Sequence, residues 1–403
     1  MESLIGKIKT QHTLYPKEVL AELGNSKKSL YIGIPKETDY QEKRIPLTPN
    51  SVAALVNFDF RITIEKDAGA NSNFSDEEYI QAGADIVFNK EDVFKADAII
   101  KSGPINPREV ALMANHQVIF SPILLPIQTK SALKSMMEKR ITAIAFEYVR
   151  GDYDTFPFMR SMSEIAGNYA IAVAARYLSN EYGRGVLLGG IAGQPPAKIM
   201  IIGAGTVGET AARAALAVGA TVQVFDDNIF RLSRLQNNLG NKIYTSVLDP
   251  INLAKNISRA HVVIGALKPK HGKTPRIVTE DMVRSMKKDA VIIDVSIDQG
   301  GCFETSVVTN HNEPIYTKHG VIHYCVPNIA SNVSRTASYA LSNILTPILK
   351  NAAKVGAIEN LLKYDEGIRK GAYLYKGTLT KDFIAQKFDL KFTDLELLLS
   401  ADY

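Results

Sequence analysis

The chain has 403 residues, 46% of them hydrophobic, and its 47 Lys and Arg against 42 Asp and Glu give a formal net charge of +5. This length and hydrophobic content are enough for two domains with separate cores. The basic residues are spread along the chain, which argues against a nucleic-acid partner, and no run of about 18 apolar residues predicts a membrane span. Cys302 and Cys325 provide neither a disulfide framework nor metal-ligand spacing. We therefore expect a soluble, cytoplasmic protein without a metal site.

Residues 1–28 are predicted to form an N-terminal extension in which Pro16 opens a short helix that Gly24 ends. From Leu30 onwards, short apolar runs alternate with helical segments. Strands are predicted at 30–34, 61–65, 84–88, 98–100, 117–120 and 141–148, and helices at 49–56, 76–82, 107–114 and 130–139. Ser75 followed by Glu78 is a capping box. This alternation predicts a mostly parallel sheet covered by helices on both faces.

A long apolar helix at 161–182 and a Gly- and Pro-rich hinge at 183–196 lead to a second unit. Its strands are predicted at 199–202, 221–225, near 242, and at 261–266, 290–295 and 321–326. These are enough for a six-stranded doubly wound sheet. A helix from Ser338 to about Ala353 follows, and the C-terminal tail is expected to return to the first unit. The fold class is therefore α/β, with two doubly wound domains.

The strand at 199–202 is followed by Gly203, Gly205 and Gly208 at G-x-G-x-x-G spacing, and then by a helical run from Thr206 to Val218. These glycines allow a sharp turn, close approach of the backbone to a pyrophosphate, and tight packing of the helix on its strand. The next strand delivers Asp226, 18 residues after Gly208, where an acid can bind the adenosine ribose hydroxyls. The predicted cofactor-binding positions here are Gly203, Gly205, Thr206, Val207, Gly208, Asp226, Ala266 and Leu267.

The glycine pattern alone is weak, because ordinary loops also contain it, but the strand, the helix and the distant acid together favour dinucleotide binding. A methyltransferase is the alternative, since its adenosyl cofactor also uses a glycine-rich turn and a strand-end acid. Asp226 and its neighbour Asp227 would repel a 2′-phosphate, so NAD is the expected cofactor in preference to NADP.

Other candidate site residues follow predicted strands, because ligands of such sheets bind at the carboxyl ends of strands. Arg44 can hold a carboxylate with two hydrogen bonds, and Lys101 can polarise a carbonyl or attract an anion. Asp298 precedes two glycines and can orient a water or an ammonium group, although a turn-capping role is an equal alternative. Asn328 can bind a substrate or the nicotinamide amide. Cys325 is interpreted as a small buried hydrophobic residue.

Several motifs resemble those of the alanine dehydrogenase and proton-translocating transhydrogenase (alpha subunit) family. They are Gly33-Ile-Pro-Lys-Glu, Glu42-Lys-Arg44-Ile-Pro-Leu-Thr-Pro49, Met162-Ser-Glu-Ile-Ala-Gly167, Gly185-Val-Leu-Leu-Gly-Gly190, Ile202-Gly-Ala-Gly205, Asp294-Val-Ser-Ile-Asp-Gln-Gly-Gly-Cys-Phe-Glu304 and Tyr324-Cys-Val-Pro-Asn328. The resemblance extends from about residue 30 to 350. It implies a homo-oligomer, a dimer or a hexamer, that acts on an amino acid and its 2-oxo acid.

The resemblance also implies the domain organisation and the roles of the site residues. A flavodoxin-like or Rossmann-like substrate domain would comprise 29–160 plus 336–403, and an NAD-binding Rossmann domain, 161–335, would be inserted into it. By position, Arg44 matches the arginine that binds the substrate carboxylate, and Asp298 the catalytic aspartate. Ser163 and Asn328 match cofactor-site positions, with Asp298 bordering both sites. The implied reaction is oxidation of L-alanine by NAD to pyruvate and ammonium.

Two positions depart from the alanine dehydrogenase pattern. The substrate lysine of that family lies two residues beyond the lysine that Lys101 matches, and this chain has Gly103 there. The catalytic histidine of the family is matched by an apolar residue, about Leu124, and His116 is expected at the far end of the preceding strand. The transhydrogenase alpha subunit also lacks this lysine and histidine, although the Asp298 segment is of the dehydrogenase type.

Three functions therefore stay open, and they belong to different classes. The first is an NAD-dependent amino-acid dehydrogenase, with L-alanine the default substrate; Arg160 and Lys101 are available for a different side chain. The second is the hydride-transfer subunit of a membrane transhydrogenase, which needs a separate membrane partner that binds NADP. The third is a non-catalytic NAD-binding protein. We favour the first, because Arg44 and Asp298 are both present and a binding-only protein has no evident need of them.

Overall fold

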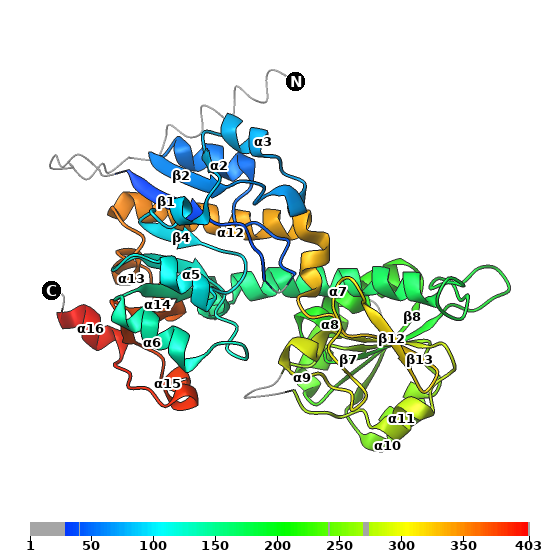
Figure 1. Ribbon diagram of the computed structural model, residues 1–403. Helices are drawn as coiled ribbons and strands as arrows, with labels where there is room; N and C mark the ends of the chain where they lie inside the picture. The colour runs from blue at the N-terminus through cyan, green and yellow to red at the C-terminus, as the bar shows by residue number, and fades with distance from the viewer. Residues whose placement is uncertain (1–28, 40, 241, 269–273, 402–403) are drawn as a thin grey trace, which may run out of the picture.

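The structure is a computed structural model that describes residues 29–39, 41–240, 242–268 and 274–401. The chain forms two lobes, and two long helices, α7 (Pro157–Leu178) and α12 (Ser334–Val355), run between them (Figure 1). The helix predicted between Pro16 and Gly24 lies outside the described residues.

The first lobe is built on an eight-stranded sheet of order β15-β14-β6-β5-β4-β1-β2-β3. Its strands are β1 (Leu30–Ile34), β2 (Phe60–Glu65), β3 (Asp85–Val87), β4 (Ala98–Ile100), β5 (Val118–Ser121), β6 (Thr142–Ala145), β14 (Ala372–Tyr375) and β15 (Thr378–Leu379). Strands β1 to β6 pair in parallel, in the order of a Rossmann fold and not of a flavodoxin-like one. Strands β14 and β15 add an antiparallel edge, so the C-terminal residues return to the first sheet as predicted.

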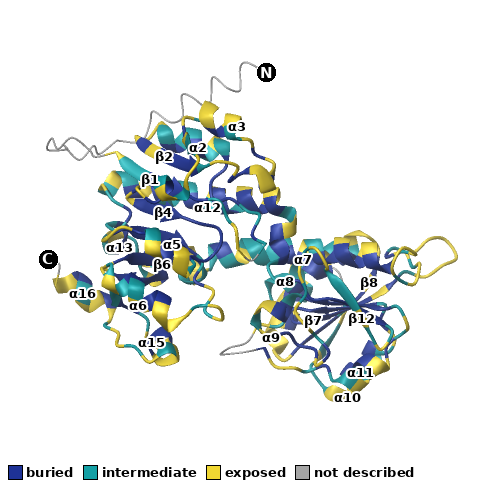
Figure 2. Ribbon diagram, viewed as in Figure 1, coloured by how far each residue is buried: buried dark blue, intermediate teal, exposed yellow. Residues whose placement is uncertain are grey.

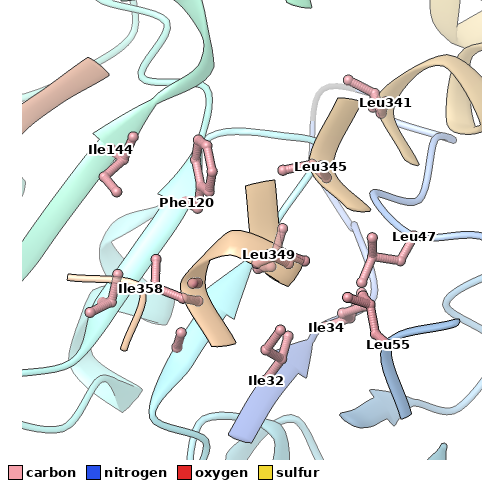
Figure 3. Close-up of a cluster of buried hydrophobic side chains, with 14 of the residues drawn as sticks. Ile32, Ile34, Leu47, Leu55, Phe120, Ile144, Leu341, Leu345, Leu349 and Ile358 are labelled. Carbon is pink, nitrogen blue, oxygen red and sulfur yellow. The ribbon is translucent and has the colours of Figure 1, made fainter. Parts of the chain in front are cut away.

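Helices cover this sheet, and α12 supplies much of the core on one face. The other helices of the lobe are α2 (Pro49–Val56), α3 (Asp76–Gln81), α4 (Lys90–Val93), α5 (Pro107–Leu112), α6 (Lys130–Glu138), α13 (Leu361–Tyr364), α14 (Glu366–Gly371), α15 (Asp382–Phe388) and α16 (Leu395–Ala401). Leu341, Leu345 and Leu349 recur every four residues on α12 and point into a buried cluster with Ile32 and Phe120 (Figure 3). Burial of each such leucine contributes about 1.5–3 kcal/mol.

The second lobe is built on a seven-stranded sheet of order β12-β13-β11-β10-β7-β8-β9. Its strands are β7 (Lys198–Ile202), β8 (Thr221–Asp226), β9 (Tyr244–Val247), β10 (Val262–Gly265), β11 (Val291–Asp294), β12 (Ile315–Lys318) and β13 (Val321–Tyr324). Its helices are α8 (Thr206–Ala217), α9 (Ile229–Leu239), α10 (Pro250–Ile257) and α11 (Glu280–Arg284). The central strands β7, β8, β10 and β11 are buried at the middle of the lobe (Figure 2).

The mostly parallel sheets and the capping box of Ser75 and Glu78 at α3 are confirmed, but several predicted bounds are wrong. The second sheet has seven strands instead of six, because β12 pairs antiparallel with β13. The strand predicted at 141–148 stops at Ala145 and continues as a 3₁₀ turn, Phe146–Tyr148. The connecting helix begins earlier than predicted, with Pro157 at its first position, and α12 begins at Ser334 instead of Ser338.

One histidine of the second lobe is fully buried. This residue is His323 of β13; its Nδ1 lies 2.9 Å from the Val321 carbonyl, and its Nε2 lies 2.8 Å from the Thr305 hydroxyl. Since a carbonyl only accepts, Nδ1 carries the proton and Nε2 accepts from Thr305. Burial disfavours the imidazolium and lowers the pKa of His323 from 6.5 to about 4.

We therefore expect the protein to lose stability as the pH falls from 6.5 towards 4. The unfolded chain binds a proton at His323 in this range and the folded chain does not, so the loss amounts to a few kcal/mol, on the order of 1.4 per pH unit. Urea unfolding at pH 7 and at pH 5 measures it. His323→Gln should show a smaller pH effect than the wild type, whereas His116→Gln, at an exposed site, should not. Equal pH effects in the wild type and His323→Gln would contradict this prediction.

Candidate functional site

Several of the predicted site residues lie at the two places where strand order reverses. In the first sheet the reversal falls between β1 and β4: the segment with Glu37 and Arg44 follows β1, and Lys101 directly follows β4. In the second sheet it falls between β7 and β10, which are followed by Gly203 and Ala266. Such points are where open α/β sheets bind ligands.

The glycine fingerprint has the geometry that a dinucleotide requires. Gly203 has φ +115°, and a Cβ there would overlap the carbonyl oxygen of Ala266. A Cβ on Gly208 would overlap the carbonyl oxygen of Gly203, because α8 packs closely on the turn. Gly205 stands at the N-cap of α8, and a Cβ on it would meet no described atom within 4 Å. The backbone N–H groups at the start of α8, where Thr206 and Val207 lie, are thus open to a pyrophosphate.

Asp226, at the end of β8, is 1% exposed and tied to this turn. Its carboxylate accepts hydrogen bonds from the backbone N–H groups of Ala204, at 2.7 Å, and Asn228, at 2.9 Å. These bonds use two of the about four acceptor positions of a carboxylate, and Arg231 Nη1 lies 3.9 Å from Oδ2. The residues present therefore fit a dinucleotide. Leu267 follows Ala266 after β10, and Ser163 lies half-buried on α7.

Asp298 and Asn328 come together at the carboxyl ends of β11 and β13. Asp298 lies in the 3₁₀ turn Val295–Gln299, and its Oδ1 accepts the backbone N–H of Asn328 at 2.9 Å. The surrounding protein raises the pKa of Asp298, while the Asn328 N–H and the charge of Arg44 act in the opposite direction. The Asp298 side chain nevertheless stays exposed, so water screens part of this effect.

Arg44 is held by a carboxylate of its own chain. Its Nε donates to Glu42 Oε1 at 2.7 Å, and its Nη2 donates to Glu42 Oε2. Its Nη1 lies 3.1 Å from the sulfur of Met162, a weak acceptor. A guanidinium has five N–H donors, so this arrangement leaves one hydrogen on Nη1 and one on Nη2 for another carboxylate.

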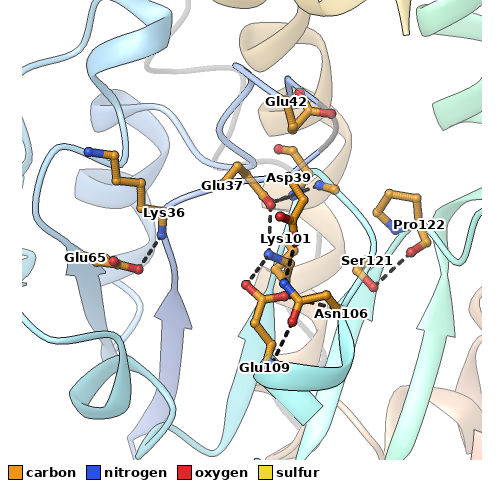
Figure 4. A network of polar contacts seen from close by, with 12 residues as sticks. Lys36, Glu37, Asp39, Glu42, Glu65, Lys101, Asn106, Glu109, Ser121 and Pro122 are labelled. Carbon is orange, nitrogen blue, oxygen red and sulfur yellow. Dashed lines mark hydrogen bonds and ion pairs between the residues drawn. The ribbon is translucent and has the colours of Figure 1, made fainter. Parts of the chain in front are cut away.

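Lys101 lies in a buried ion network and not at the surface of the first lobe (Figure 4). It is 1% exposed, and its Nζ donates to Glu37 Oε2 at 2.8 Å and to Glu109 Oε1 at 2.9 Å. Burial disfavours the charge, but the two carboxylates outweigh it and raise the pKa of Lys101. Two of its three ammonium hydrogens are thus engaged. Its contact with a substrate stays a prediction.

Neither of the two positions that depart from the dehydrogenase pattern has a cationic side chain. The backbone N–H of Gly103 donates to Glu37 Oε1 at 2.9 Å, and a Cβ there would lie 3.0 Å from Glu37 Oε2. Leu124 follows β5 with φ +44°, and its N–H donates to Glu147 Oε1 at 2.9 Å. His116 lies before β5 and is exposed, as expected.

Sequence reasoning missed four ionisable groups near this site: Glu42, Glu109, Glu147 and His311. Glu42 carried one signal, an acid two residues from Arg44, whereas Glu147 lay inside the strand predicted at 141–148 and follows β6 only because that strand ends at Ala145. Cys325, by contrast, is buried as predicted, and burial raises the pKa of its thiol to about 11, which does not suit a nucleophile.

Among the described residues, no three His, Cys, Asp or Glu are placed to hold a metal ion. No described helix is long and apolar enough to cross a bilayer.

The chain is similar to known proteins over most of its length. Residues 33–166 match the family described as alanine dehydrogenase/PNT, N-terminal domain, and residues 170–382 match the corresponding C-terminal domain. An alanine dehydrogenase of Methanococcus maripaludis is 38% identical over 92% of this chain and 100% of its own length. An alanine dehydrogenase of Staphylococcus haemolyticus is 36% identical over the same shares.

Solved structures of two kinds resemble this one. A structure named L-alanine dehydrogenase has a TM-score of 0.84 and 35% identity, covering 89% of this chain and 99% of its own. A transhydrogenase from Sinorhizobium meliloti has a TM-score of 0.75 and 25% identity, covering 87% of this chain and 100% of its own. Both share the two-lobed α/β fold. This chain therefore belongs to the alanine dehydrogenase/PNT family, and is an oxidoreductase of that family.

Proposed function

We propose that this protein is an NAD-dependent alanine dehydrogenase that converts L-alanine to pyruvate and ammonium, and the reverse. In this proposal, residues 29–160 plus 336–403 form the substrate domain and residues 161–335 the NAD-binding domain. We further propose that it acts in the cytoplasm as a homo-oligomer, a dimer or a hexamer, which size-exclusion chromatography with light scattering tests. The relatives named alanine dehydrogenase, 36–38% identical over nearly the full chain, support the reaction.

One observation carries the proposal: Arg44 and Asp298, from different lobes, are joined by hydrogen bonds that pass through Glu42 and Asn328. An amino acid needs a cation for its carboxylate and an acceptor for its ammonium group. Arg44 keeps two N–H donors for the carboxylate, and Asp298 is an exposed carboxyl. The pair therefore matches both charged groups of an α-amino acid.

Within this site, we assign one role to each residue. NAD would supply the hydride acceptor when bound. Arg44 fixes the substrate carboxylate, which orients the α-carbon. Asp298 accepts a proton from the amino group or from an attacking water, and its raised pKa brings it nearer to the working pH of a general base. Lys101 pairs with Glu37 and Glu109, and Glu37 in turn accepts the backbone N–H of Gly103, so Lys101 positions this loop.

The direct test is the absorbance of NADH after purified protein is mixed with NAD and a panel of L-amino acids. Turnover with alanine supports the proposal, and turnover with another amino acid alone would replace the substrate but keep the class. Binding of NAD in a thermal-shift assay, without turnover of any amino acid, would contradict a dehydrogenase and favour a non-catalytic NAD-binding protein.

We expect NAD to be preferred to NADP, and Asp227 to contribute to the preference. Asp227 is exposed next to the buried Asp226, so both charges would oppose a 2′-phosphate. Asp227→Asn should raise kcat/KM for NADP relative to NAD by roughly five- to tenfold, from roughly 1 kcal/mol of repulsion near a surface. The same change at Asp281, exposed on α11, is the control. An unchanged ratio in Asp227→Asn would disprove the role of Asp227.

A hydride-transfer subunit of a transhydrogenase is the second candidate, because Gly103 and Leu124 stand where alanine dehydrogenases have their lysine and histidine. The likeness to the Sinorhizobium meliloti transhydrogenase supports it. Such a subunit would be inactive with amino acids and would require a membrane partner that binds NADP. Hydride transfer between NADH and an NADP analogue in isolated membranes, dependent on added protein, would favour this candidate.

A further inference from the structure

The two lobes meet at a short segment of the first lobe, residues 41–44. Gln41 Oε1 accepts the backbone N–H of His311 at 2.6 Å, and the backbone N–H of Lys43 donates to the Ser331 hydroxyl at 2.8 Å. Both partners belong to the part of the chain that follows β11. The residue at the centre of this segment is Glu42, which sequence reasoning passed over.

Glu42 is 5% exposed, and its carboxylate joins groups that are far apart in the sequence. Oε1 accepts the backbone N–H of Arg44 at 2.9 Å and lies 3.1 Å from the Ser331 hydroxyl. Oε2 accepts from Arg44 Nη2 and, at 2.9 Å, from the side-chain amide of Asn328. Burial favours the protonated form, but the Arg44 charge and these hydrogen bonds outweigh it and lower the pKa of Glu42. The carboxylate is therefore ionised.

This carboxylate controls the orientation of Arg44. It occupies the Nε and Nη2 side of the guanidinium, so the side bounded by Nη1 and Nη2 is left to bind a second carboxylate. A neutral or absent acceptor at residue 42 would leave Arg44 free to turn. An uncompensated guanidinium would then lie in a partly buried place.

The same carboxylate reaches the cofactor side of the site. Asn328 gives its side-chain amide to Glu42 and its backbone N–H to Asp298, so an unbroken chain of hydrogen bonds runs from Arg44 through Glu42 and Asn328 to Asp298. Asn328 has φ +53°, in the left-handed region that asparagine tolerates better than most residues. Because Glu42 and Asn328 belong to different lobes, the bond between them depends on the position of one lobe relative to the other.

We propose that Glu42 is a positioning residue that couples binding of the substrate carboxylate at Arg44 to binding of the cofactor beside Asn328 and Asp298. The proposal rests on the proposed function, because it assumes an amino acid or 2-oxo acid at Arg44. A substrate carboxylate at Arg44 stabilises the lobe arrangement in which the Glu42–Asn328 bond exists. That arrangement is the one in which the cofactor-side residues are assembled.

The test is the affinity for NADH with and without saturating pyruvate, in buffer free of ammonium so that no turnover occurs. The chain contains no Trp, so NADH fluorescence reports binding without Trp emission. Coupling between two ligands is typically about 5- to 150-fold, and we expect pyruvate to tighten NADH binding to the wild type within this range. Glu42→Gln should bind NADH alone within about threefold of the wild type, yet lose the tightening by pyruvate.

Two further variants keep the result interpretable. Asn328→Gly, where glycine suits the positive φ, keeps the Arg44–Glu42 pair but removes the Glu42–Asn328 bond, so it should lose the tightening too. Glu396→Gln is the matched control: Glu396 is exposed on α16 and pairs with Arg369 at 3.0 Å, and this variant should behave as the wild type. If Glu42→Gln misfolds in thermal unfolding, Asn328→Gly carries the test.

The outcomes separate this inference from the proposed function. Full tightening in Glu42→Gln or Asn328→Gly overturns the coupling role. A wild type that oxidises alanine but shows no tightening overturns the coupling and leaves the proposed function in place. A wild type with neither tightening nor turnover overturns both.

Discussion

Replacement of Arg44 by alanine is expected to lower kcat/KM for the amino acid by about 30- to 5,000-fold. Truncation of one partner of a hydrogen-bonded charge pair costs about 2–5 kcal/mol, and here it removes the two N–H donors that stay available for the substrate carboxylate. Steady-state NADH formation measures the loss. Most of the effect should appear in KM, because the carboxylate is bound before and during hydride transfer.

The same substitution should also destabilise the protein. It leaves Glu42 ionised, 5% exposed and without its cation, which costs about 3–5 kcal/mol for a buried pair. Arg44→Lys retains the charge but not the planar fork, so it should be more stable than Arg44→Ala and still impaired in KM. Arg61→Ala, in an exposed pair with Asp85, should change neither property. Normal kinetics of a folded Arg44→Ala would exclude Arg44 from the substrate site.

Asp298→Asn is expected to lower kcat by about 10²- to 10⁴-fold, the usual contribution of a general acid or base. The asparagine keeps an oxygen for the backbone N–H of Asn328, so the turn and the affinity for NADH should persist. Stopped-flow measurement of NADH formation separates this loss of chemistry from product release. Retained kcat in Asp298→Asn would show that another group moves the proton.

The wild-type pH profile supplies a second readout for Asp298. A base must be ionised, and the pKa of Asp298 lies above the ordinary value of 3.8, so activity should fall as the pH decreases through that raised pKa. The acidic limb should vanish in Asp298→Asn, whose residual activity no longer depends on this carboxyl. An identical limb in both proteins would assign it to another residue.

Local sequence was sufficient to predict the geometry of the glycine turn. Gly203, Gly205 and Gly208 work within one strand, turn and helix, and each requirement concerns backbone atoms only a few residues away. The capping box of Ser75 and Glu78 is equally local. Asp226 was predictable because a βαβ unit fixes the distance from the glycines to the next strand end. Its two bonds to Ala204 and Asn228 were not predictable.

The substrate side depended on contacts between distant segments. Sequence placed Lys101 at a strand end, but only packing against Glu37 and Glu109 buried it. Strand β12 lies at the edge of its sheet, and its sequence has no strong apolar pattern, so it was not predicted. It forms by antiparallel pairing with β13. Helix α7 begins at Pro157 because proline suits the first position of a helix, which the apolar periodicity did not show.

By itself, the sequence determined the α/β class, the two doubly wound sheets, the glycine turn and the family, because these follow from short-range periodicity and motif spacing. Only the tertiary structure decided that Arg44 is held by Glu42 and that Glu42 reaches Asn328, 286 residues further along the chain. The physical reason is that hydrogen bonds and ion pairs depend on distances of about 3 Å between side chains. For residues in different lobes, those distances are set by the packing of α7 and α12 between the lobes.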